Sequence, residues 1–301
     1  MAGFGDVEFW TAPDGARLAL RRALPGGAGG AGGTGGGGRR RATVLLLHGF
    51  GDHSGRYPEV AAWLADRGLA VYALDQRGHG RSPGKRGHIS RFAQFLSDVA
   101  ALRRLAAAED GGPQLLLGHS FGGFVVLRYL ETGPEGLAGA IVSSPHLAAA
   151  MRAPLWKRGL ARALGELLPA LPVATGLDLA HLSTDPAVGQ AVRSDPLFHR
   201  VMTPRAHREV TAAQAATLAE GERIRVPVLF LLAGDDRIAS RPVAERFARG
   251  LAGDVTVRVY DGFYHELFNE PHRARVFRDV ETWLERILAG PAPAGAGPAA
   301  A

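Results

Sequence analysis

Short apolar runs alternate along the chain with longer stretches in which apolar positions recur at helical spacing. The short runs predict buried strands at residues 42–47, 70–74, 114–117, 139–143, 227–232 and 256–260. Two further strands, near residues 7–10 and 17–22, flank the turn Pro13-Asp14-Gly15 and predict a hairpin. Helices are expected at residues 58–67, 89–109, 121–131, 242–249 and 271–288. The alternation predicts a mostly parallel, eight-stranded sheet with helices on both faces.

Residues 146–223 break this alternation, because their pattern is helical, with several prolines and no convincing strand. We interpret them as a helical cap inserted between two parts of one core, residues 1–145 and 224–289. A stripe of apolar residues runs along the cap: Leu155, Trp156, Leu160, Leu164, Leu167, Leu168 and Leu171. The stripe fits an amphipathic helix packed on its own domain, and it also fits a lid that touches membranes or micelles.

Two segments have low complexity, the glycine-rich residues 26–38 and the Ala/Pro/Gly tail at residues 290–301. Neither can bury enough apolar surface to offset the entropy of ordering it, so both are expected to be flexible. We interpret the glycine-rich segment as a lengthened loop between two strands.

The composition excludes several classes of protein. At 301 residues the chain can bury a sizeable core, and the lack of cysteine rules out disulfides, thiolate metal sites and a cysteine nucleophile. The formal net charge of +6 comes from scattered arginines, and only Arg39, Arg40 and Arg41 form a run, so nucleic-acid binding is not expected. Neither a secretory signal nor a membrane-spanning segment is apparent, and we expect a cytoplasmic protein, with peripheral membrane contact at most.

A Gly-x-Ser-x-Gly turn, Gly118-His119-Ser120-Phe121-Gly122, follows the strand at residues 114–117 and precedes a helix. This context predicts a nucleophile elbow, in which a strained backbone exposes the serine. Side chains two positions before and two positions after the serine would collide, which explains the glycine at both places. We therefore expect Ser120 to be a catalytic nucleophile.

A serine hydroxyl needs a histidine to accept its proton and an acid to hold that histidine in the right tautomer. Hydrolases with such an elbow carry these residues in the order serine, acid, histidine. The loop after residues 227–232 contains two acids, of which we choose Asp236; Asp235 is the alternative, and it would otherwise make a turn or a surface ion pair. The loop after residues 256–260 contains His265, the expected base.

The negative charge that develops on a carbonyl oxygen under attack needs two backbone N–H donors. Phe121, directly after the nucleophile, is expected to supply one of them. Phe50, in the His48-Gly49-Phe50-Gly51 loop, is expected to supply the other. His48 is expected to brace this loop by hydrogen bonding.

Five segments together resemble the monoacylglycerol lipase and lysophospholipase group of the α/β-hydrolases. They are residues 48–57 (HGFGDHSGRY), 75–89 (DQRGHGRSPGKRGHI), 118–123 (GHSFGG), 234–239 (GDDRIA) and 260–270 (YDGFYHELFNE). In the cap, residues 182–196 (LSTDPAVGQAVRSDP) are similar to the same group. The pieces HSGRY, GHI and YHE are the more selective ones, because many α/β-hydrolases share His-Gly-x-Gly and Arg-Gly-His-Gly-Arg-Ser.

The resemblance implies an α/β-hydrolase fold with an inserted cap and the hydrolysis of monoacylglycerols through an acyl-enzyme, without a metal or an organic cofactor. It transfers the catalytic roles to Ser120, Asp236 and His265, and the oxyanion roles to Phe50 and Phe121. The alternatives are a lysophospholipase or general carboxylesterase, a proline-type aminopeptidase, and a ligand-binding protein of this fold that has lost catalysis. The expected partner is a small lipid ester, and the sequence does not indicate an oligomeric state.

Overall fold

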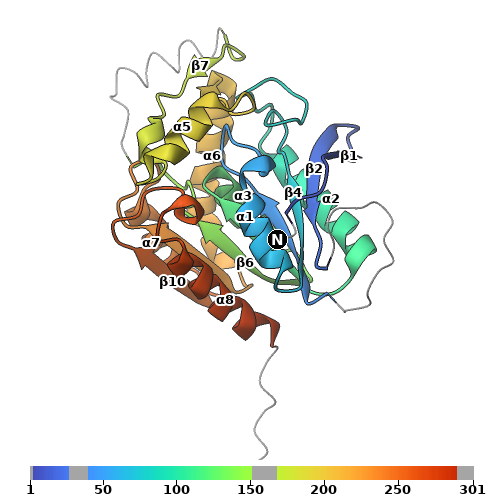
Figure 1. The fold of residues 1–301 in the computed structure, drawn as a ribbon. Coiled ribbons are helices and arrows are strands. Elements are labelled where there is room, and N and C mark those ends of the chain that lie inside the picture. Colours follow the sequence, from blue (N-terminus) through green and yellow to red (C-terminus); the bar gives the residue numbers. More distant parts are fainter. Residues whose placement is uncertain (1–2, 27–39, 151–167, 290–301) are drawn as a thin grey trace, which may run out of the picture.

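The computed structural model describes residues 3–26, 40–150 and 168–289. A sheet of eight strands runs through the molecule in the order β1-β2-β4-β3-β5-β6-β9-β10 (Figure 1). Its strands are β1 (Glu8–Thr11), β2 (Arg17–Ala23), β3 (Ala42–Leu47), β4 (Leu69–Leu74), β5 (Gln114–His119), β6 (Leu137–Ser143), β9 (Val228–Ala233) and β10 (Val255–Tyr260). β2 pairs antiparallel with β1 and β4, and all other neighbours are parallel. The predicted eight-stranded, mostly parallel sheet is confirmed.

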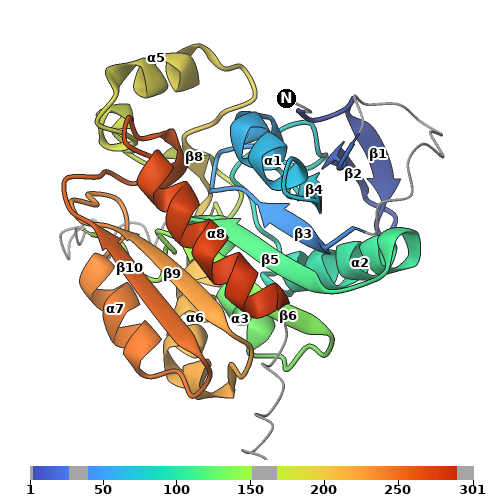
Figure 2. The same ribbon diagram turned by 60° about the horizontal axis from the view of Figure 1, so that its bottom comes forward.

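Helices cover both faces of the sheet (Figure 2). α1 (Pro58–Ala65) and α8 (Ala274–Leu288) pack on one face, and α2 (Ala93–Asp110), α3 (Phe121–Leu130) and α7 (Arg241–Arg249) pack on the other. The expected helices are present, but α2 and α8 begin three or four residues later than predicted. The residues before these two helices form turns instead, such as the Arg273 N–H to Glu270 carbonyl bond of 3.1 Å.

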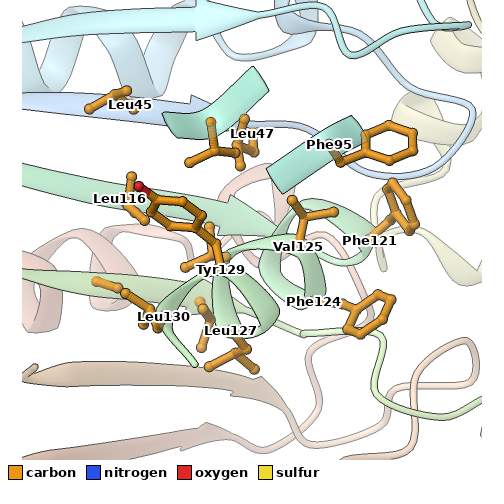
Figure 3. Packing of buried hydrophobic residues seen from close by; sticks show 14 of the residues in the cluster. Leu45, Leu47, Phe95, Leu116, Phe121, Phe124, Val125, Leu127, Tyr129 and Leu130 are labelled. Atoms are coloured by element: carbon orange, nitrogen blue, oxygen red, sulfur yellow. The ribbon is translucent and has the colours of Figure 1, made fainter. Parts of the chain in front are cut away.

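Alternation along the strands divides the core into two layers. In β3, Leu45 and Leu47 belong to the layer under α2 and α3, whereas Val44 and Leu46 belong to the layer under α1 and α8. Figure 3 shows the first layer, in which the side chains of α3 pack close to those of β3 and β5. Because both faces are covered, β9 is apolar at every position and β3 at every position but Thr43, and both strands are fully buried. This packing holds α3, and the turn before it, in a fixed place.

The cap lies at one end of the molecule (Figure 1). Its described elements are β7 (Val173–Ala174), η2 (Leu179–His181), α5 (Pro186–Ser194), β8 (Val201–Met202), α6 (Pro204–Glu220) and η3 (Gly221–Arg223). The prediction of no strand here was wrong, since β7 and β8 pair antiparallel; strands of two residues are too short to leave an alternating pattern. The cap boundaries at residues 146 and 223 stay a prediction.

Several predicted features lie outside the described residues. Most of the apolar stripe, residues 155–167, is among them, as are residues 27–38 of the glycine-rich segment and the tail at residues 290–301. The two described members of the stripe, Leu168 and Leu171, are exposed. Within the described ranges, no helix is both long enough and apolar enough to span a bilayer.

Candidate active site

The turn between β5 and α3 has the backbone geometry of the predicted elbow. Ser120 has φ +52° and ψ −113°, a backbone conformation that residues other than glycine rarely adopt. A Cβ added at Gly122 would collide with the carbonyl oxygens of Leu47 and His48, and one at Gly118 would lie 2.5 Å from the Gly122 carbonyl oxygen. Both glycines are therefore required by close backbone contacts, and the turn presents the Ser120 side chain beyond the end of β5.

Loops from the carboxyl ends of β9 and β10 bring two of the predicted residues to Ser120. The Ser120 hydroxyl lies 2.8 Å from His265 Nε2, and His265 Nδ1 lies 2.8 Å from Asp236 Oδ2. The second oxygen of Asp236 accepts the N–H groups of Ile238 and Ala239, both at 2.8 Å. These bonds fix the Asp236 carboxylate, which in turn orients the imidazole. The structure thus brings Ser120, His265 and Asp236 together in a hydrogen-bonded line.

Asp235, the alternative acid, does not join this line. Its side chain is exposed, and its backbone N–H donates to the Phe263 carbonyl at 3.0 Å, which joins the two loops that carry Asp236 and His265. The two neighbouring acids thus occupy different environments: Asp236 is buried beside His265, whereas Asp235, in the turn after β9, faces solvent.

Burial and charge act on the pKa values of this line in opposite directions. For Asp236, burial raises the pKa, but the charge and the hydrogen bond of His265 and the two backbone N–H groups lower it more, so the net pKa is lowered. For His265, burial lowers the pKa, but Asp236 raises it more, so the net pKa lies above its ordinary value of 6.5. The pair therefore favours an ionised acid next to a histidine that readily accepts a proton.

Phe50 and Phe121, the two predicted oxyanion donors, lie next to each other. Their rings meet edge to face with centroids 5.6 Å apart, although Phe50 follows β3 and Phe121 opens α3. The Phe121 N–H is in the first turn of its helix, where amides have no acceptor within the helix. Within the described part of the chain, neither the Phe50 nor the Phe121 N–H donates to an acceptor. The prediction that they stabilise an oxyanion requires such amides without an acceptor.

The loop that carries Phe50 is held by His48. The Nδ1 of His48 lies 2.7 Å from the Gly49 carbonyl, and its Nε2 accepts the Gln76 N–H at 2.9 Å. The Gln76 side-chain amide donates back to the His48 carbonyl at 2.8 Å. These three bonds fix the ring in one tautomer and attach the loop to the segment after β4, as expected for a brace.

A largely buried ion network next to the line of Ser120, His265 and Asp236 was not predicted from the sequence. Arg56 donates to both oxygens of Glu266 at 2.9 and 2.8 Å, and to Asp52 at 3.1 Å. The Tyr57 hydroxyl donates to the other oxygen of Asp52 at 2.7 Å. Arg56 and Tyr57 belong to the selective piece HSGRY, and Glu266 directly follows His265. The arginine of a selective motif was the available signal, but its partner Glu266 lies 210 residues away.

The cap attaches directly to these loops. His53 Nε2 lies 2.8 Å from Asp195 after α5, and the Glu266 N–H donates to the Leu182 carbonyl at 2.7 Å. The His199 N–H donates to the carbonyl of Gly51, beside Phe50, at 2.9 Å. The cap is therefore bonded both to the loop that carries Phe50 and to the loop that carries His265.

Together, the fold and the line of Ser120, His265 and Asp236 define a serine ester hydrolase with the α/β-hydrolase fold. The family described as "Serine aminopeptidase, S33" matches residues 38–272. The monoacylglycerol lipase of Mycolicibacterium smegmatis is 36% identical over 250 residues, which cover 81% of this chain and 88% of that protein. The chain belongs to the monoacylglycerol lipase and lysophospholipase family of α/β-hydrolases.

Two other proteins extend the comparison. Phospholipase YtpA of Bacillus subtilis is 29% identical over 251 residues, covering 82% of this chain and 96% of that protein. The crystal structure of Paleococcus ferrophilus monoacylglycerol lipase superposes with a TM-score of 0.79 at 33% identity, over 90% of this chain and 99% of that one. The likeness therefore extends through the cap as well as the core.

Proposed function

We propose that this chain hydrolyses monoacylglycerols to a fatty acid and glycerol, with Ser120 as nucleophile, His265 as general base and Asp236 as its partner. The observation that carries the proposal is the pair of 2.8 Å contacts that link these three side chains. The lipases of M. smegmatis and P. ferrophilus, which this chain resembles over most of its length, support the choice of substrate.

The geometry supports a reaction in two chemical steps. His265 accepts the Ser120 proton as the hydroxyl attacks the ester carbonyl, and the N–H groups of Phe50 and Phe121 stabilise the oxyanion. His265 then donates that proton to the departing glycerol oxygen, which leaves an acyl group on Ser120. A water molecule, deprotonated by His265, attacks the acyl carbonyl, and His265 returns the proton to the Ser120 oxygen as the fatty acid is released. No metal or organic cofactor takes part in these steps.

A second candidate substrate is a lysophospholipid. The similarity to phospholipase YtpA, which covers nearly the whole of that protein, favours it. Both substrates present one acyl ester next to a polar alcohol, so the same three residues would act on either. The alcohol group alone distinguishes the two proposals.

We also infer that the cap touches lipid aggregates when substrate enters. Three large apolar side chains near its tip, Leu168, Leu171 and Val173, are exposed to 50%, 46% and 48%. Apolar side chains exposed together are a feature of surfaces that bind apolar partners. The cytoplasmic location stays a prediction.

A substrate screen tests the function directly. Purified protein and its Ser120→Ala variant are assayed with monoacylglycerols of several chain lengths, lysophosphatidylcholine, p-nitrophenyl butyrate and a proline p-nitroanilide. We expect the highest kcat/KM with a monoacylglycerol and no turnover by the variant. Preference for the lysophospholipid would support the second candidate. Hydrolysis of the anilide alone would contradict both and would favour a peptidase.

A further inference from the structure

His199, in the cap, lies against the loop that carries Phe50. Its backbone N–H donates to the Gly51 carbonyl at 2.9 Å. A Cβ added at Gly51 would collide with the His199 carbonyl oxygen, so a glycine, here with φ +77°, allows the two backbones to touch. The proposed reaction gives no role to His199 or to this contact.

The His199 ring also packs on the Phe50 ring. The two rings meet edge to face with centroids 5.6 Å apart. The buried ring of His79 lies 5.1 Å from that of Phe50 and 4.9 Å from that of His199. With Phe121 at 5.6 Å, the Phe50 ring contacts one ring of the cap and two of the core. Such aromatic contacts restrict the position of Phe50 from the side of the cap.

The His199 imidazole contributes to this packing through its shape and not through its charge. Among the described residues, neither of its ring nitrogens finds a hydrogen-bond partner, although both atoms are buried. Burial, and then the charge of Arg86, lowers the pKa of His199 to about 4, so the ring is uncharged at neutral pH. An aromatic ring without nitrogens should therefore fill the same place.

The peptide group that contains the Phe50 N–H is held from two sides. Its carbonyl, that of Gly49, lies 2.7 Å from His48 Nδ1, which belongs to the core. On the other side of Phe50, the Gly51 carbonyl accepts the N–H of His199, which belongs to the cap. An oxyanion donor must point at a position that Ser120 fixes, so a rotation of this peptide group would weaken its contribution.

We propose that His199 is a positioning residue, through which the cap holds the Phe50 N–H toward the oxyanion. This inference rests on the proposed function, because it takes Phe50 as the second oxyanion donor. Loss of one such donor typically lowers kcat by about 10²–10³, and a displaced donor should cost less. A cap that only encloses the substrate would instead change KM.

Kinetics of two His199 variants test this role. His199→Ala removes the ring and should lower kcat for a monoacylglycerol roughly tenfold, with KM changed less than about threefold. His199→Phe retains a ring and should keep kcat within about threefold of wild type. His207→Ala, at an exposed histidine of α6, is the matched control and should behave like wild type. An unchanged kcat in His199→Ala, or no recovery of kcat in His199→Phe, would overturn the proposal.

Two inhibitors separate the transition state from the bound substrate. An alkyl trifluoromethyl ketone forms a tetrahedral adduct with Ser120 and places a negative oxygen at the N–H donors. 1-O-Dodecylglycerol has an ether instead of the ester and therefore no carbonyl oxygen for these donors. His199→Ala should weaken inhibition by the ketone roughly tenfold and inhibition by the ether less than about threefold. Equal losses for both inhibitors would assign His199 to substrate binding and contradict the proposal.

Hydrogen exchange measures the contact without requiring turnover. Amide exchange in a peptide that covers residues 48–57 is followed by mass spectrometry. His199 is only partly buried, so we expect His199→Ala to fold and to exchange at least roughly threefold faster in this peptide than wild type. His199→Phe and His207→Ala should exchange like wild type. Unchanged exchange in His199→Ala would show that the cap does not hold the loop. Lack of turnover by wild type would count against the proposed function alone, and exchange would still decide the role of His199.

Discussion

Two groups of buried, hydrogen-bonded polar side chains lie side by side in this molecule, and they differ in whether a proton can be transferred along their bonds. One is the pair His265–Asp236 with Ser120, and the other is Arg56 with Asp52 and Glu266. Glu266 follows His265 in the chain, so the two groups share a loop. Arg56 bonds both oxygens of Glu266 and one of Asp52, and Tyr57 bonds the remaining Asp52 oxygen.

The two groups differ in whether one of their members can accept and donate a proton. The ion network has a partner for each carboxylate oxygen, and its charges lower the pKa values of Asp52 and Glu266 despite the opposing effect of burial. It can only hold its loops together. In the line of Ser120, His265 and Asp236, the imidazole lies 2.8 Å from each of its two partners, and Ser120 has a positive φ that is rare outside glycine. In the proposed reaction, this imidazole takes up and releases one proton. The ion pairs of Arg56 hold two loops in place. The proposed reaction instead requires a proton that His265 can accept and donate.

The largest expected effect separates the two groups by function. Ser120→Ala should lower kcat by about 10⁶, because it removes the nucleophile. The same substitution should leave the midpoint of urea unfolding nearly unchanged, since it removes only one hydroxyl and its single side-chain hydrogen bond, to His265. Steady-state kinetics and urea titration measure the two quantities. Substantial residual activity would mean that another residue attacks the ester.

Substitution of Asp236 and Asp235 in turn tests which of the two carboxylates orients His265. Asp236→Asn should lower kcat by about 10⁴, because an amide stabilises the wrong tautomer of His265 and cannot stabilise its cation. Asp235→Asn is the matched control, one residue away with an exposed side chain, and should change kcat less than about threefold. The reverse order of effects would transfer the role to Asp235.

Substitution of Arg56 in the ion network should lower the free energy of unfolding and not the rate of ester hydrolysis. Arg56→Gln leaves Asp52 and Glu266 buried without their cation, and we expect a loss of about 3–5 kcal/mol in the free energy of unfolding. Arg273→Gln, which breaks the exposed pair with Glu59, should cost less than about 1 kcal/mol. Urea titration compares the two variants. If folded Arg56→Gln protein were as inactive as Ser120→Ala, the division between the two groups would be wrong.

The pH profile of activity sharpens the comparison further. His265 must be neutral to accept the Ser120 proton, so kcat/KM should fall as the pH drops through its pKa, which lies above 6.5. The charged groups that face His265 are Asp236, Glu266 and Asp52, with neutral His119 and His146 nearby. Asp236→Asn should shift the acid limb to lower pH, because it removes the charge that raises this pKa most. An unchanged limb in the residual activity would show that another group titrates.

The smallest effect concerns His119, which lies between the two groups with its ring 4.9 Å from that of His265. Burial, and then the charge of His265, lower its pKa to about 4. Because the unfolded chain takes up this proton near pH 6.5 and the folded chain only near pH 4, stability should decline as the pH falls from 6.5 to 4. His119→Gln should flatten this decline in urea titrations at several pH values. A slope identical to wild type would show that other buried histidines produce it.

Much of the fold and the catalytic line could be predicted from the sequence because their signals are local. Val228–Ala233 is apolar throughout since the strand is buried on both faces, and Gly118 and Gly122 mark a turn that tolerates no side chain. The parallel sheet then requires the loops after β9 and β10 to end at the same edge as the elbow. The position of His265 follows from this topology and not from any feature of the residues around it.

The sequence by itself therefore determined the sheet, the elbow and the residues that meet at the carboxyl edge, because alternation, glycine spacing and loop order are all written in neighbouring residues. Only the tertiary structure decided between Asp235 and Asp236, because the choice depends on which side chain turns toward His265. It alone joined Arg56 to Glu266 and His53 to Asp195, since contacts between side chains far apart in the chain leave no periodic signal. Interactions between neighbouring residues determine the helices, strands and turns, and tertiary packing determines which charged side chains come into contact.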